Sequence, residues 1–280
     1  MKKFFYIAIM IAAVFAGCSN QGNEQNAAEE ARAKSKAKLE DRLTSPEAQF
    51  EARLQELKKL GKRRGVNKDS LQAVYDAYLQ EQAMAHIGEE LGLKITHSLA
   101  VNFNYKQLDS VMNLCEVYKQ DPELNRLHEA ALNAEATGVG KRYVDFEAEE
   151  RRGDKMTRLS KLMAKGKPIV LTFWTSSSIP CRNEIREFIQ PIVQDYRKDV
   201  LFVCTAVMED TIYDAQRAAS ELEIIWPMLY AGDKNNPPTK PYGVLHLPHT
   251  LIIGKDGIIK ARGLRGAQIE EAIKKEIGRK

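Results

Sequence analysis

The chain has 280 residues, which is long enough for one or two domains with a substantial core, and its formal net charge is +4. Lysines and arginines are interspersed with acidic residues, as in KAKLEDR (36–42). A nucleic-acid partner requires a basic face, so none is expected.

The N-terminus has the features of a secretory signal. Two lysines precede an apolar run over residues 4–15, which is too short to span a bilayer. The run ends in FAGC, and these small residues before Cys18 resemble the lipobox of bacterial lipoproteins, although Phe15 departs from the usual leucine. The resemblance implies a signal peptide over residues 1–17 and a lipidated Cys18; the alternative is an ordinary signal with an incidental cysteine. Ser19 favours an anchor in the outer membrane of the cell envelope, facing the periplasm or the cell surface.

A tether and then a helical region are expected next. Residues 18–45 contain almost no large apolar side chains, so they predict a flexible tether. Ser45, followed by proline and glutamate, is typical of a helix start. Residues 46–138 therefore predict a small all-α region, although no motif in it points to a function. Its apolar stripes at helical spacing are Phe50, Leu54 and Leu57; Leu71, Val74, Tyr75 and Tyr78; and Leu108, Val111, Cys115 and Tyr118.

The other cysteines and the histidines indicate no metal site. Cys115 lies on an apolar stripe, so we expect a buried structural thiol there, and Cys204 lies within a predicted strand and is expected in the core. His86 and His97 have no partner at ligand spacing, and no Cys/His spacing resembles a zinc site. We therefore expect no metal and no cofactor.

From residue 139 onward the sequence alternates between strands and helices. Buried strands are predicted over 169–174 and 200–207, helices over 180–196, 213–222 and 268–277, and a hairpin with a Lys-Asp-Gly turn over 249–263. This order requires a right-handed parallel crossover followed by an antiparallel hairpin. The fold class is α/β, with a central mixed sheet flanked by helices over residues 139–280.

Three blocks of this half resemble membrane-anchored thioredoxin-like proteins of the TlpA and ResA type, which are thiol-disulfide oxidoreductases related to the AhpC/TSA proteins. Gly140–Phe146 is similar to their GxxAPDF opening, and LTFWTSSSIPCRNE (171–184) is similar to their strand and active-site helix, usually FWAxWCxPCRxE. YGVLHLPHTLIIGKDGIIKARG (242–263) is similar to the block that contains their cis proline. The resemblance implies a thioredoxin fold and a cis peptide bond before Pro248.

The chemistry of that family needs two cysteines separated by two residues at a helix N-terminus. The resemblance assigns Ser178 to the position of the nucleophile and Cys181 to that of the resolving cysteine. Serine cannot form a disulfide, and its hydroxyl is not ionised at neutral pH without an activating base. We therefore interpret Ser178 as the N-cap of the helix that contains Cys181. The alternative is a serine nucleophile with His249 as its base.

A peptide-binding groove can persist without the redox pair. In this fold the residue before the cis proline pairs its backbone with an extended peptide, and here that residue is Leu247. His249 is expected either to line the groove and titrate near pH 6.5 or to be an ordinary surface histidine. The predicted walls are Trp174, Ser178, Ile179, Pro180, Leu247, Pro248 and His249.

Two functions remain open at this point. The first is a binding protein of the envelope that takes an extended peptide or a partner protein without dithiol turnover. The second is an active single-cysteine thiol exchanger or redox sensor, which uses Cys181 to form a mixed disulfide or a sulfenic acid. A disulfide between Cys181 and Cys204 is a further alternative, which requires both side chains at disulfide distance.

Overall fold

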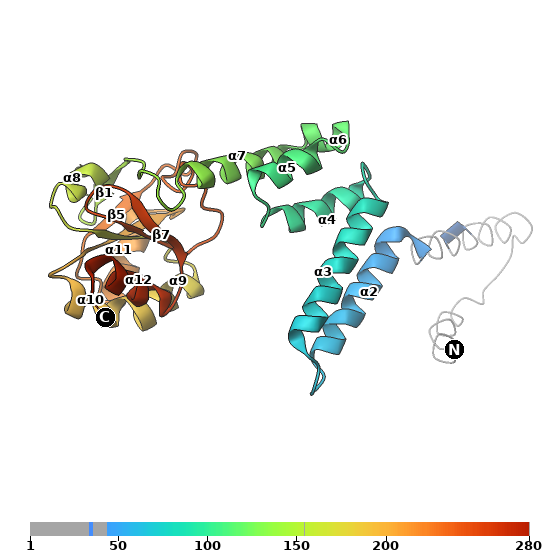
Figure 1. Ribbon diagram of the computed structural model, residues 1–280, viewed down its shortest axis with the longest axis horizontal. Helices are drawn as coiled ribbons and strands as arrows, with labels where there is room; N and C mark the ends of the chain where they lie inside the picture. Colours follow the sequence, from blue (N-terminus) through green and yellow to red (C-terminus); the bar gives the residue numbers. More distant parts are fainter. Residues whose placement is uncertain (1–33, 36–43, 154, 280) are drawn as a thin grey trace, which may run out of the picture. The chain divides into compact units, whose positions relative to one another are not determined.

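A computed structural model describes residues 34–35, 44–153 and 155–279 of the chain (Figure 1). The predictions for the signal peptide, for Cys18 and for most of the tether lie outside these residues. The chain divides into two compact units, residues 1–82 and 83–280, and each is described by itself. The helices of the predicted all-α region are therefore shared between the units.

The first unit contains α2 (Pro46–Gly61) and most of α3 (Lys68–Ala85). The predicted start of α2 is confirmed, because the Ser45 hydroxyl accepts a hydrogen bond of 3.2 Å from the backbone N–H of Ala48. Phe50 of α2 stacks on Tyr78 of α3 with ring centroids 5.8 Å apart, and Leu57 is buried. The predicted stripe on α3 is wrong at Val74, which is half exposed.

Four further helices open the second unit. They are α4 (Glu90–Ala100), α5 (Tyr105–Met112), α6 (Glu116–Gln120) and α7 (Pro122–Ala136), and they share a core of Ala100, Leu108, Tyr118, Leu124 and Leu127. The predicted stripe through Cys115 is wrong, because α5 ends at Met112. Cys115 has an extended backbone at the N-cap of α6, and it is only partly buried.

A seven-stranded mixed sheet forms the centre of this unit, in the order β2-β1-β5-β4-β3-β6-β7. The strands β3 and β4 are parallel, and β3, β6 and β7 are successively antiparallel, which confirms the predicted parallel pair and the antiparallel hairpin. The sequence did not predict β1, β2 and β5. The strands are β1 (Glu147–Glu150), β2 (Met156–Arg158), β3 (Ile169–Trp174), β4 (Leu201–Val207), β5 (Met228–Ala231), β6 (His249–Ile253) and β7 (Ile259–Leu264).

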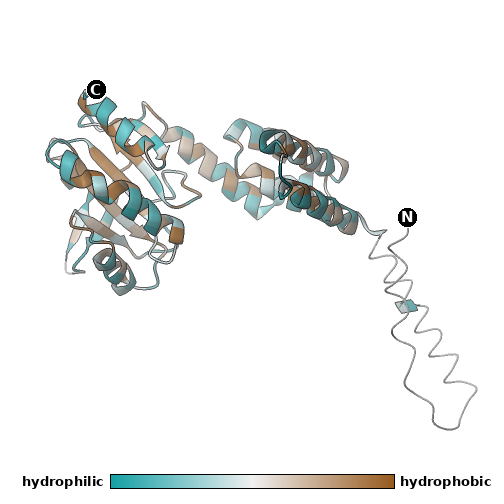
Figure 2. Ribbon diagram, turned by 90° about the horizontal axis from the view of Figure 1, so that it is seen from below, coloured by the Kyte–Doolittle hydropathy of each residue, from teal (hydrophilic) through white to brown (hydrophobic). Residues whose placement is uncertain are grey.

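Helices cover both faces of the sheet, and each face has its own core. In Figure 2 the strands are largely hydrophobic, while the helices beside them carry hydrophilic stretches. One core contains Trp174 and Cys181, and the other contains Phe173 and Tyr242. The first core is covered by α9 (Ile179–Glu184), η1 (Ile185–Ile189), α10 (Gln190–Tyr196), α11 (Ile212–Glu221) and α12 (Gln268–Ile277), and the second by α8 (Leu159–Met163).

The predicted helix over 180–196 is not continuous. A π-helical turn, η1, separates α9 from α10, and Pro191 lies at the beginning of α10. Proline has no backbone N–H, so the carbonyl one turn earlier loses its α-helical donor and the helix changes its hydrogen-bond pattern there.

The end of α7 is fastened to the sheet by a group of contacts that we call the α7 junction: Arg262, Thr137, Tyr242, Gly243 and Leu245. The Arg262 guanidinium donates to the carbonyls of Ala134, Thr137 and Tyr242 at 2.7 to 2.9 Å and to the Thr137 hydroxyl at 3.0 Å. Gly243 has a φ of +60°, and a Cβ there would lie 2.1 Å from the Ala130 carbonyl oxygen. Only glycine fits this close approach of the loop to α7.

Candidate functional site

The candidate site lies where β3 ends and β6 begins. Because these strands are antiparallel neighbours, Phe173 near the end of β3 pairs with His249 at the start of β6. The turn after β3 leads directly into α9, which contains Cys181. The Leu247–Pro248 peptide bond is cis, as the resemblance implied. The topology therefore brings the segments 174–181 and 247–249 to the same end of the sheet.

Ser178 is the N-cap of α9, which confirms that interpretation. Its hydroxyl accepts a hydrogen bond of 3.3 Å from the backbone N–H of Cys181. The next two residues, Ile179 and Pro180, are exposed, and 71% of Ile179 is accessible to solvent. The turn therefore presents an apolar side chain outward and a capped helix start inward.

The Cys181 thiol is fully buried beneath this turn. Burial raises its pKa, and hydrogen bonds from Ser178 and Thr175 together with the positive charge of Arg265 offset only part of that effect. A thiolate is the reactive form of cysteine, so a raised pKa and burial both lower the reactivity of Cys181.

Cys204 is a core residue, as predicted. The Trp226 indole N–H donates to its sulfur at 3.0 Å, and burial raises its pKa to about 12. Cys181 and Cys204 are both free thiols in the structure. The alternative of a disulfide between them is therefore wrong for this structure.

Two of the predicted wall residues are placed differently from the expectation. Trp174 is fully buried, because both faces of β3 are covered, and it cannot form part of an exposed surface. His249 pairs with Phe173, so its side chain lies on that face of the sheet, whereas Trp174 and Cys181 belong to the core on the other face.

The predicted titration of His249 near pH 6.5 is also wrong. Burial, with the nearby charges of Arg262 and Arg265, lowers its pKa to about 4. Its buried Nε2 atom has no hydrogen-bond partner among the described residues. Its position on the opposite face of the sheet from Cys181 gives no support to a Ser178–His249 catalytic pair.

Leu247 keeps its backbone polar groups unpaired. The residue is partly buried and packs against both cores, and it precedes the cis proline outside β6. Within residues 44–153 and 155–279, neither its N–H nor its C=O has a hydrogen-bond partner. A backbone donor and acceptor left without partners can pair with the backbone of an added peptide strand.

A buried carboxylate, Glu209, completes the site, and sequence reasoning missed it. It accepts hydrogen bonds of 2.5 Å from the backbone N–H and from the hydroxyl of Ser176. It follows Met208, whose φ of +58° is unusual for a residue with a side chain. The turn thus directs Glu209 inward and leaves Met208 exposed. No spacing motif signals this arrangement, since Glu209 follows a different strand, β4.

The hollow beside this turn is lined by charges that already have partners. Arg182 forms an ion pair of 2.5 Å with Glu221, and Arg217 forms one of 3.1 Å with Asp214. Glu209 is engaged by Ser176, as described above. The two arginines of this hollow are therefore already paired and offer little positive charge to a ligand.

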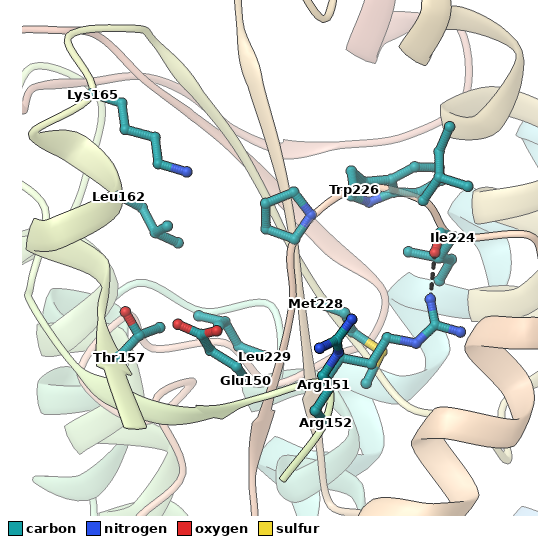
Figure 3. A pocket seen from close by; sticks show the side chains of 12 residues that line it. Glu150, Arg151, Arg152, Thr157, Leu162, Lys165, Ile224, Trp226, Met228 and Leu229 are labelled. Carbon is teal, nitrogen blue, oxygen red and sulfur yellow. Dashed lines mark hydrogen bonds between the residues drawn. The ribbon is translucent and has the colours of Figure 1, made fainter. Parts of the chain in front are cut away.

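A second pocket lies at the opposite end of the sheet, beside the start of β5 (Figure 3). Since β3, β4 and β5 are parallel, the start of β5 is remote from the end of β3. Figure 3 shows Arg151 engaged with the Ile224 carbonyl, to which it donates at 2.6 Å; it also donates to the Ser220 hydroxyl at 2.9 Å. Arg151 thus holds the loop before β5, away from the thiol.

The described residues contain neither a cluster of metal-ligating side chains nor a helix able to span a membrane. No group of three or more His, Cys, Asp or Glu side chains is placed to hold a metal ion in this part of the chain. None of the helices within the described ranges combines the length and apolar character needed to cross a membrane.

Comparison with known proteins agrees with the motifs. Residues 139–262 match the model of the AhpC/TSA family. The thiol-disulfide oxidoreductase ResA of Bacillus thuringiensis subsp. konkukian is 24% identical over 135 residues, which are 48% of this chain and 74% of that protein. ResA of Geobacillus thermodenitrificans is 25% identical over 142 residues, covering 51% and 78% of the two chains.

Solved structures are similar over the same half. The C-terminal domain of a putative thiol-disulfide oxidoreductase from Bacteroides thetaiotaomicron has 20% identity and a TM-score of 0.46, covering 51% of this chain and 97% of that one. A putative thiol:disulfide interchange protein DsbE from Chlorobium tepidum has 21% identity and a TM-score of 0.41, covering 49% and 98%. In sequence, the C-terminal half of this chain is similar to thiol-disulfide oxidoreductases of the ResA type.

Proposed function

We propose that this chain is a thioredoxin-fold binding protein of the bacterial cell envelope, which holds an extended peptide or a segment of a partner protein without dithiol turnover. The observation that carries the proposal is the unpaired backbone of Leu247 beside cis-Pro248. Backbone pairing of this kind supplies affinity for an extended peptide.

The absence of dithiol turnover follows from residues in the turn before α9. The sequence contains no Cys-x-x-Cys, and Ser178 precedes Cys181 by three residues. Its hydroxyl caps the helix, and the thiol behind it is buried with a raised pKa. The same burial speaks against the second candidate, a single-cysteine thiol exchanger, since exchange requires an accessible thiolate.

The binding proposal can be tested with a library of random ten-residue peptides displayed on phage and selected on the full chain. Ile179 and Ile225 provide a matched pair, because both are exposed isoleucines, at 71% and 69%, and they lie at opposite ends of the sheet. We expect Ile179→Asp to weaken binding of the selected peptides at least about ten-fold, since it replaces an exposed apolar side chain of the proposed site by a charged one.

Ile225→Asp serves as the control and should bind like the natural chain. Failure to select any peptide, or an equal loss in the two variants, would contradict a peptide site at this end of the sheet. Unfolding curves of both variants check that neither substitution acts through stability.

The envelope location is a separate part of the proposal and depends on Cys18. The sequence FAGC at residues 15–18 supports cleavage before Cys18 and its lipidation. We expect Cys18→Ser to move the protein from the membrane fraction to the soluble fraction of a bacterial host. An unchanged distribution of the variant would refute the lipid anchor.

A further inference from the structure

Arg265 is an exposed cation without a partner, next to the site. It follows β7 directly, and Leu264 at the end of β7 pairs with Thr250 of β6. Arg265 therefore lies at the end of the sheet where β6 begins, which is the end that holds His249 and cis-Pro248. Among the described residues, no hydrogen bond or ion pair engages its guanidinium.

The turn that carries Arg265 is also tied to α9. The backbone N–H of Gly266 donates to the Glu184 carboxylate at 2.8 Å, one turn along the helix from Cys181. Arg265 is thus held between α9 and the start of β6. Its positive charge lowers the pKa of both Cys181 and His249, so its field extends to both segments of the site.

The acids of the surrounding elements accept hydrogen bonds from other groups, and within the described residues none of them forms an ion pair with Arg265. Glu184 accepts from Gly266, and Glu209 accepts from Ser176. Glu270, on the helix that follows, accepts from the Tyr196 hydroxyl and forms an ion pair with Lys274. An acidic group brought by a ligand would find the Arg265 guanidinium without an ion-pair partner among the described residues.

We infer that Arg265 makes this site select extended peptides with an acidic side chain close to the residue that pairs with Leu247. The inference rests on the proposed peptide-binding function and adds the chemical class of the ligand. A charge at the rim of a binding site contributes mainly to selectivity, because opposite charges attract and like charges repel the wrong partner.

The same decapeptide library tests the inference when the natural chain is compared with Arg265→Gln and Arg265→Glu. The natural chain should enrich aspartate or glutamate at one fixed position of the selected peptides. Arg265→Gln should lose this enrichment and bind the acidic peptides about five-fold more weakly, as expected for one exposed ion pair. Arg265→Glu should enrich lysine or arginine at that position instead.

Arg197→Gln is the matched control, because Arg197 is exposed, has no ion pair in the described ranges, and precedes β4 at the other end of the sheet. It should keep the acidic preference. If the natural chain selects peptides without that preference, or if Arg265→Gln retains it, the inference is overturned while peptide binding stands. If no variant selects any peptide, the inference and the proposed function fail together.

Discussion

The α7 junction and the candidate site lie on the two sides of the loop that leads to cis-Pro248. They differ in how many of their polar groups have hydrogen-bond partners. At the junction, Arg262 satisfies three backbone carbonyls, and the Tyr242 hydroxyl donates to the Val144 carbonyl at 2.6 Å. At the site, the backbone of Leu247 and the guanidinium of Arg265 have no partner in the described part of the chain.

This difference indicates that the α7 junction supports the loop, whereas the candidate site is available to a ligand. Buried polar groups without partners cost free energy, so the bonds from Arg262 and Tyr242 to backbone carbonyls stabilise the attachment of α7 to the sheet. Groups left unpaired near the surface are available to a ligand. The helices α5 to α7 thereby acquire a role that their sequence did not suggest, since they hold the loop that precedes cis-Pro248, with Leu245 packed against their core.

The largest effect is expected from removing the cation of the junction. Arg262→Met should lower the free energy of unfolding by about 4 kcal/mol, because several partly buried carbonyls lose a charged donor at once. Urea denaturation of the full chain measures this. Arg53→Met, which breaks an exposed ion pair with Glu56, is the control and should change stability by less than about 0.5 kcal/mol. Equal effects would remove the distinction between the junction and an ordinary surface contact.

A smaller effect on the free energy of unfolding is expected when the pH is lowered, because His249 becomes protonated. Its pKa is about 4 in the folded chain, below the ordinary value of 6.5, so the unfolded chain binds the proton more readily. The stability that His249 contributes is therefore fully present above pH 6.5 and is lost as the pH falls towards 4, by up to about 3 kcal/mol.

Urea denaturation at pH 7, 5 and 4 measures this loss, and His249→Gln should abolish its share. Nuclear magnetic resonance titration of the imidazole gives the pKa directly. A value near 6.5 would mean that the imidazole is solvated and that the burial described here is incorrect.

The smallest effect concerns the helix cap at the site. Ser178→Ala should lower the free energy of unfolding by about 1 kcal/mol, since the N–H of Cys181 loses its acceptor. Ser177→Ala, one residue earlier and exposed, is a suitable control with little expected change. If the two alanine variants were equally stable, Ser178 would have no capping role.

The sequence predicted those parts of the fold that have strong apolar patterns. The strands β3 and β4 and the β6–β7 hairpin were found because buried strands are continuous apolar runs and Lys-Asp-Gly marks a turn. The strand β1, EAEE, has no such run, and β5 is only four residues long, so neither was recognised. Pro191 does indicate an interruption of the helix after Cys181, because proline lacks a backbone N–H, but the predicted helix over 180–196 ran through it.

The site was predicted correctly at the cis proline and at the cap, where family motifs fix local geometry. The prediction was wrong for residues whose burial or face of the sheet depends on strand register. Trp174 belongs to a strand covered on both faces, and His249 follows the face of Phe173. Arg265 and Glu209 were missed because they reach the site from other strands, and no spacing in the sequence connects them to Cys181.

The most direct test of the account is the reduction of insulin disulfides by the full chain, with dithiothreitol as the source of electrons. The natural chain should not accelerate the reaction beyond dithiothreitol alone, whereas Ser178→Cys should, because it restores two thiols at the helix start. Adding Cys181→Ser to that variant should remove the gain in turnover. Acceleration by the natural chain itself would show that Cys181 is reactive and would contradict the account of a binding protein without dithiol turnover.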